Sequence, residues 1–208
     1  MEILNITNGD AFNRYLLSKI GGEAIPFREA MMDGEAVLDV YSDKFIEARS
    51  KEHCVSVEEY KSKMLSKNIC EYSKLNLWFG KDTFCQMNLL TLLAYLEQIK
   101  YDGEVALNYI DDETFDVIET DIQVELLGYT NLYNTILIKK SKSNNVGVLN
   151  SNAIDLYFDY HSSDGALAQI VRENATMQDI DLTCLLLKKS KKYGLSDIQA
   201  AKLIKKYK

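Results

Sequence analysis

Ionisable and amide side chains follow four short apolar segments of the chain. Such groups have a definite chemistry, because an arginine or lysine can bind a phosphate or carboxylate, and aspartates can hold a hydrated magnesium ion. Asp82 and Gln86 lie four residues apart, so that a helix would place both on one face and within reach of one ligand. The groups are Asn8-Gly9-Asp10, Arg28-Glu29, Gly80-Lys81-Asp82 and Asp111-Asp112.

We predict from these groups a ligand site and a weaker metal site, with no residue assigned to catalysis. An aromatic residue is included because Trp78 could stack on a base or sugar ring, although a tryptophan in a strand is more often a core residue. The predicted ligand-binding residues are Asn8, Gly9, Asp10, Arg28, Glu29, Trp78, Lys81, Asp82 and Gln86. The predicted metal ligands, for magnesium, are Asp10, Asp82 and Asp111.

Each of these groups also has a purely structural interpretation. Asp10 has the residue type and position of a helix N-cap. The stretch from Thr83 to Gln86 matches a capping box, in which the glutamine only satisfies a helix end. Asp111 and Asp112 fit a solvated turn. For any single group the structural role is favoured, and it is the coincidence of four groups that favours a site.

Several familiar catalytic signatures are missing from the sequence. It contains no GxxxxGK[ST] phosphate loop, no GxGxxG fingerprint and no GxSxG elbow. His53 and His161 are isolated, which favours surface or core positions over catalysis. The thiol of Cys85 follows a helix start, where its pKa could fall, but the sequence shows no basic neighbour, so packing explains it better.

The elements that must position the polar groups alternate between strand and helix. Short turns between such elements predict parallel strands with crossover helices, so the fold class is α/β, a mainly parallel Rossmann-like open sheet with flanking helices. The carboxyl ends of parallel strands share one edge, where ligands bind. Strands are predicted at 2–7, 23–27, 75–79 and 104–110, and helices at 11–20, at 83–99 and, as a pair, within 44–72.

The pattern changes after residue 125, where helical segments follow one another. We therefore divide the chain into an α/β body, residues 1–125, and a helical C-terminal part, residues 126–208. Gly194 ends one predicted helix and Ser196 can cap the next. The helices of this part are predicted at 131–140, 152–160, 165–173, 179–192 and 197–207.

Charge is distributed unevenly over these two parts. Residues 1–130 carry 24 acidic and 12 basic side chains, whereas residues 131–208 carry 7 and 12, which gives the net charge of −7. An acidic body argues against broad nucleic-acid binding, and the basic end leaves that partner open only for the C-terminal helices. No apolar run is long enough to span a membrane and no secretory signal is visible, so we expect a cytoplasmic protein that does not act at a membrane.

The four cysteines show no CxxC pairing. Their irregular spacing predicts free thiols in a reducing compartment. They are Cys54, Cys70, Cys85 and Cys184.

At this point the motifs resemble a bacterial family catalogued as domain of unknown function 1835. The similarity rests on NGD after the first strand, the Arg-Glu pair after the second, and WFGKDTFCQMNLLTLLAYL. It covers residues 3–125 and is weak beyond them, apart from GLSDIQAAKL near the end. Phe27 stands where the family has Trp, and Lys81 where a His often precedes the Asp, which argues against a histidine base there. The residues that the resemblance carries over are Asn8, Gly9, Asp10, Arg28, Glu29, Trp78, Asp82 and Gln86.

The resemblance implies no established activity, and two functions stay open. The favoured one is binding or processing of a small phosphorylated or nucleotide-like ligand at the carboxyl edge of the sheet. The alternative is a non-enzymatic regulatory or adaptor protein whose basic helical C-terminus contacts a protein or nucleic acid, with a helix-turn-helix around Gly194-Leu195-Ser196. Whether the protein is an enzyme, and its oligomeric state, do not follow from the sequence.

Overall fold

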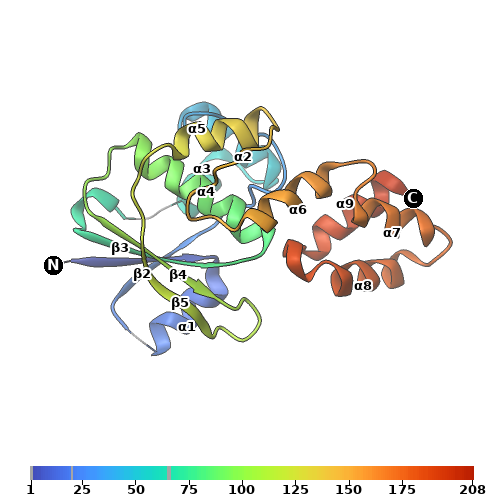
Figure 1. Ribbon diagram of the computed structural model, residues 1–208, viewed down its shortest axis with the longest axis horizontal. Helices are drawn as coiled ribbons and strands as arrows, with labels where there is room; N and C mark the ends of the chain where they lie inside the picture. The colour runs from blue at the N-terminus through green and yellow to red at the C-terminus, as the bar shows by residue number, and fades with distance from the viewer. Residues whose placement is uncertain (1, 20, 65–66) are drawn as a thin grey trace.

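The computed structural model describes residues 2–19, 21–64 and 67–208, and its centre is one five-stranded sheet (Figure 1). The strands lie in the order β2-β1-β3-β4-β5. The first four are parallel to one another, and β5 pairs antiparallel with β4. The predicted open, mainly parallel α/β sheet is therefore confirmed. The strands are β1 (Ile3–Asn8), β2 (Glu23–Phe27), β3 (Lys74–Gly80), β4 (Glu104–Ile110) and β5 (Val117–Gln123).

Helices cover both faces of this sheet. The side chains of β3, which alternate between the two faces, show which helix covers which face. Leu77 belongs to the main core, which α4 (Thr83–Gln98) covers. Trp78, one residue later, belongs to a separate cluster with Phe12 of α1 (Asp10–Lys19). Because successive side chains of a strand point to opposite faces, α1 and α4 lie on opposite sides of the sheet. Figure 1 shows α1 below the sheet and α4 above it.

The helix α4 is buried nearly all round, as its apolar sequence predicted. The sheet covers one side of it, and α5 (Tyr129–Tyr133) and α6 (Ser151–His161) pack against it as well. Two further helices, α2 (Asp43–Glu52) and α3 (Val57–Lys63), lie in the layer above the sheet (Figure 1). Burying a leucine side chain fully contributes roughly 1.5–3 kcal/mol, so α4 anchors the body strongly.

The last helices form a compact group beyond α6 (Figure 1). They are α7 (Ala166–Glu173), α8 (Asp179–Lys189) and α9 (Asp197–Tyr207). Ser196 and Gln199 form a capping box at the start of α9, as the sequence predicted for Ser196. The helix α5 packs closely on α4. The first helix beyond residue 126 therefore belongs spatially to the layer over the sheet.

Short irregular helices complete the chain. A 3₁₀ turn at Ile69–Glu71 precedes β3, and a second at Lys191–Tyr193 follows α8. The predicted helix 179–192 thus stops at Lys189 and continues as that tighter turn. A π-helical turn, Asn134–Ile138, extends α5. Ile20, the last residue of the predicted helix 11–20, lies outside the described residues.

One strand had no counterpart among the sequence predictions. The strand β5 is an edge strand, and nearly all of its side chains are exposed.

In the described part of the chain, no helix is both long and apolar enough to cross a membrane. Three cysteines are exposed free thiols, and Cys85 is buried.

Candidate ligand and cation site

The strand order creates a crevice at one point of the carboxyl edge. The chain leaves β1 through α1 on one face, whereas it leaves β3 through α4 on the other face, so the two connections diverge between neighbouring strands. Ligands of such sheets bind at this switch point. A cavity of about 860 Å³ lies there, lined by Asn8 at the end of β1 and by Asp82 and Cys85 after β3. The opposite wall comes from the connector Ser190–Leu195 between α8 and α9.

Asp82 occupies the N-terminus of α4. Its carboxylate accepts a hydrogen bond from the backbone N–H of Cys85 at 2.9 Å, which makes it the N-cap. The capping box expected from Thr83 to Gln86 is therefore not the one that forms. On its other side the carboxylate lies against Gly194, where a Cβ atom would overlap Asp82 Oδ1. Gly194 also has φ +65°, a conformation that favours glycine.

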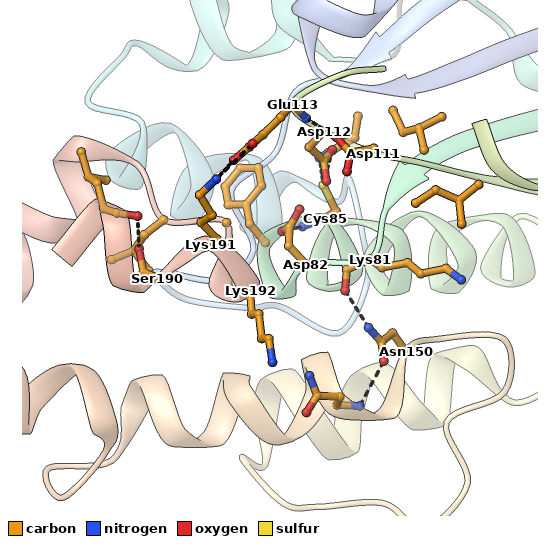
Figure 2. A pocket seen from close by; sticks show the side chains of 18 residues that line it. Lys81, Asp82, Cys85, Asp111, Asp112, Glu113, Asn150, Ser190, Lys191 and Lys192 are labelled. Carbon is orange, nitrogen blue, oxygen red and sulfur yellow. Dashed lines mark hydrogen bonds and ion pairs between the residues drawn. The ribbon is translucent and has the colours of Figure 1, made fainter. Parts of the chain in front are cut away.

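Asp112, at the end of β4, turns its carboxyl group inward although the residue as a whole is exposed. It lies directly over Gly80, where a Cβ would overlap the carboxylate. The thiol of Cys85 donates to Asp112 Oδ1 at 3.4 Å. One donor atom from each of Asp82, Cys85 and Asp112 lies within 4.8 Å of the others. Figure 2 shows the three side chains pointing toward one another. We call them the switch-point cluster.

The environment of this cluster favours protonated groups. Loss of solvent, followed by the hydrogen bond and charge of Asp82, raises the pKa of Asp112 to about 8. Burial, together with Asp82 and Asp112, raises the pKa of the Cys85 thiol well above its usual value. The sequence raised the idea that the helix N-terminus lowers the pKa of Cys85 and promotes its thiolate. The surroundings favour the protonated thiol instead. The amide of Asn8 donates to the Cys85 sulfur at 2.8 Å.

A bound cation would favour the ionised form of Asp112, because it compensates the repulsion between the two carboxylates. Oxygen ligands suit a hard ion such as Mg²⁺, which is bound through one or two carboxylates and keeps several waters. The protonated Cys85 thiol adds no ligand for such an ion, whereas a softer metal would have to displace its proton. The donor set therefore fits magnesium through Asp82 and Asp112, with Cys85 as a neutral neighbour.

The remaining charged groups of the cavity are mostly neutralised. Lys191 pairs with Glu113 at 2.7 Å. Lys81 pairs with Glu119 at 3.1 Å and points away from the switch-point cluster (Figure 2). The Asp111 carboxylate accepts the backbone N–H groups of Glu113 and Thr114, which makes it part of a turn. Its proposed role as a metal ligand thus competes with a structural one.

The structure brings four of the predicted residues to this cavity and places the others elsewhere. Asn8, Lys81, Asp82 and Asp111 line it. Gln86 is buried behind the cavity, where its amide donates to Gly80 O at 2.6 Å and accepts from the Asn150 N–H at 2.8 Å. It therefore joins the end of β3 to the start of α6.

The residues around Asp10 lie at the same edge but toward the other face. Gly9, with φ +83°, forms the turn between β1 and α1. Asp10 begins α1, and Arg28 pairs with it at 2.8 Å, which lowers the pKa of Asp10. Neither lines the cavity of Asp82. Trp78 is buried on the same face and donates to Asn5 Oδ1 at 2.9 Å, so it has the core role that strand position favours.

Glu29 lies in a closed interior network. Arg49, which is fully buried, donates to its carboxylate at 2.9 Å, and Tyr60 also donates to it. His53 lies 3.4 Å from the same group. Burial alone would raise the pKa of Glu29, but His53, Arg49 and Tyr60 outweigh it and leave the pKa below its usual value. Arg49 also donates to the carbonyls of Ala30 and Asp33, and so fixes the loop after β2.

Several residues of the cavity were not among the predicted site residues. Asp112 belonged to one of the four strand-end groups, with a solvated turn as its alternative role, but it was not named as a ligand. No local signal marked Asn150 or the lysines of the connector, because only the fold brings them to the sheet edge.

Comparisons of the chain with models of known protein families, with curated proteins and with solved structures found no match. The resemblance to domain of unknown function 1835 therefore stays a prediction, and the site rests on its geometry.

Proposed function

We propose that the protein binds a small phosphorylated or nucleotide-like ligand through a divalent cation, magnesium, at the switch-point cavity. The observation that supports this most is the switch-point cluster itself: Asp82 and Asp112 bring carboxylate oxygens within 4.8 Å of each other beside the N-terminus of a buried helix. Among the described residues, no basic side chain forms an ion pair with Asp82 or Asp112, as Arg49 does with Glu29. A cation is the partner that its chemistry calls for.

A phosphorylated ligand follows from the charges around that cation. Without a cation, the Asp82 carboxylate would repel a bare anion, whereas a magnesium ion held by ionised Asp82 and Asp112 would attract one and leave coordination positions for phosphate oxygens. The helix N-terminus of α4 adds a favourable field for negative charge. The cavity, at about 860 Å³, falls within the size range of small-molecule sites.

Titration calorimetry with Mg²⁺ alone, and then with inorganic pyrophosphate in the presence of Mg²⁺, tests this function. We expect both to bind the parent protein. Asp112→Asn should lose both, because one of two carboxylate ligands is removed while the shape is kept. Asp10→Asn is the matched control: it alters an aspartate at the same sheet edge that does not line the cavity, and it should retain both.

Two outcomes would contradict the proposal. Failure of Mg²⁺ and of pyrophosphate with Mg²⁺ to bind the parent would remove the function altogether. Equal binding by the parent and Asp112→Asn would remove the switch-point cluster as the site.

The alternative, an adaptor that uses a basic C-terminal face, gains no specific support from the arrangement of the lysines. Lys202 pairs with Glu52 and Lys208 with Asp179, both at 2.6 Å. Together with Lys191, these lysines are engaged within the molecule. Nucleic-acid binding needs basic groups gathered along one face, so the cation site is the better-supported function.

A further inference from the structure

Resting on this proposed function, we infer that the ligand carries a diphosphate group and that Lys192 binds the phosphate farther from the cation. The class would include nucleoside diphosphates and diphosphate esters. Lys192 would then determine specificity, because it selects two linked phosphates over one.

The first support is the state of the three lysines that line the cavity. Lys81 and Lys191 are held by Glu119 and Glu113. Within the described part of the chain, Lys192 forms no ion pair. An ammonium group is a compact charge with three donors, well suited to a phosphate. Lys192 is therefore the cavity lysine whose charge stays available to a ligand.

The second support is how firmly the backbone of Lys192 is held. The buried hydroxyl of Thr83, the first residue of α4, lies within hydrogen-bond distance of two carbonyl oxygens: Ala153 O at 3.2 Å and Lys192 O at 3.3 Å. The next residue, Tyr193, donates its hydroxyl to Asp159 at 2.6 Å. These contacts fix the backbone of Lys192 relative to the sheet edge. The conformational entropy that the lysine loses when it binds a ligand is therefore smaller.

The third support is that the two charged positions lie on different walls. Figure 2 shows Asp112 on the sheet side of the cavity and Lys192 extending toward the α6 side, with Asp82 between them. A single phosphate occupies only a small part of a cavity of about 860 Å³. A ligand that meets both the cation and the ammonium group needs two linked anionic groups, and a diphosphate supplies them.

The test compares the dissociation constants of inorganic pyrophosphate and of orthophosphate, each in saturating Mg²⁺, for three proteins. In the parent, pyrophosphate should bind at least about tenfold more tightly, since one charge-assisted contact contributes roughly that factor. Lys192→Gln should lose this margin while its Mg²⁺ affinity is unchanged. Lys189→Gln, an exposed lysine of α8 that does not line the cavity, should keep the margin and controls for net charge.

The outcomes separate this inference from the function on which it rests. If Lys192→Gln keeps the tenfold margin, or if the parent has none, the assignment of Lys192 is wrong while cation-dependent phosphate binding stands. If neither anion binds the parent in Mg²⁺, the proposed function is wrong and the inference falls with it.

Discussion

Two acidic sites at the same edge of one sheet differ in whether the surrounding chain compensates their charge. Glu29, after β2, is enclosed by Arg49, Tyr60 and His53, so its charge is compensated inside the protein. Asp82 and Asp112, after β3 and β4, face each other beside a buried thiol and a cavity. Both sites take carboxyl groups away from solvent, but among the described residues a buried counter-charge is supplied to Glu29 and not to Asp82 or Asp112.

This difference separates residues that serve the fold from residues that are free for a ligand. An isolated buried charge is costly, so a charge that matters for stability is paired within the protein. At the switch-point cluster, by contrast, loss of solvent, together with the hydrogen bond and charge of Asp82, raises the pKa of Asp112, which is a cost to the apo protein. Perturbed groups of this kind concentrate at functional sites.

Removing the counter-charge of Glu29 should have the largest effect on stability. Arg49→Met keeps most of the side-chain volume but leaves Glu29 buried without its cation, and it frees the carbonyls that Arg49 binds. We expect the free energy of unfolding to fall by about 3–5 kcal/mol, as measured by urea denaturation. A loss below about 1 kcal/mol would show that pairing Glu29 with Arg49 contributes little to stability. Glu29 would then not differ from the switch-point cluster in the way described.

The contributions of Asp112 and Glu29 to the free energy of unfolding should change with pH in opposite directions. The folded pKa of Asp112 is raised, so the native protein holds a proton that the unfolded chain releases, and this group lowers stability as pH rises from about 4 to about 8. The folded pKa of Glu29 is lowered, so its contribution is present above its unfolded pKa and is lost as pH falls. We expect Asp112→Asn, measured without metal, to be more stable than the parent at pH 8 and to gain less at pH 5.

A parent and an Asp112→Asn variant with the same stability profile between these pH values would contradict that assignment. It would mean that the Asp112 carboxyl is solvated as an ordinary aspartate, and that the switch-point cluster is looser than its geometry indicates.

The smallest effect is expected at the third acidic position of this edge. Asp10 and Arg28 form an ion pair whose side chains are 48% and 37% exposed, and such pairs contribute between about 0 and 1 kcal/mol. Arg28→Gln should therefore melt close to the parent and bind Mg²⁺ and pyrophosphate unchanged. Loss of pyrophosphate binding at normal stability would extend the site around the edge of the sheet, toward the position first predicted from the sequence.

Much of the fold could be predicted because its elements carry strong local patterns. The helix α4 is apolar nearly all round, and the strands β3 and β4 are apolar runs interrupted by one asparagine each, as is typical of buried parallel elements. The strand β5 could not be recognised from hydrophobic content, since most of its residues are exposed at an edge. Its β-branched residues alternate with acids, a pattern that a partly solvated edge strand allows.

The site was predictable only as far as the sheet edge itself. Asn8 is the last residue of β1 and Asp82 comes two residues after β3, so the pairing of these two strands brings them together. The prediction did not distinguish the two faces of that edge, which is why Asp10 and Arg28 were grouped with Asp82. Lys192 is more than a hundred residues away from Asp82 in the chain, and nothing local to either residue encodes their proximity.

The contact between Asp82 and Gly194 has a thermodynamic consequence. The Asp82 carboxylate caps a helix of the body and rests against the connector of the C-terminal helices, and it is also one of the two carboxylates proposed to hold the cation. Under the proposed function, occupancy of the site and the position of those helices would be coupled, and by reciprocity each would change the other by the same factor. The C-terminal helices would sense the ligand without any contact of their own beyond the connector, and anything that held them in place would tighten binding at the sheet.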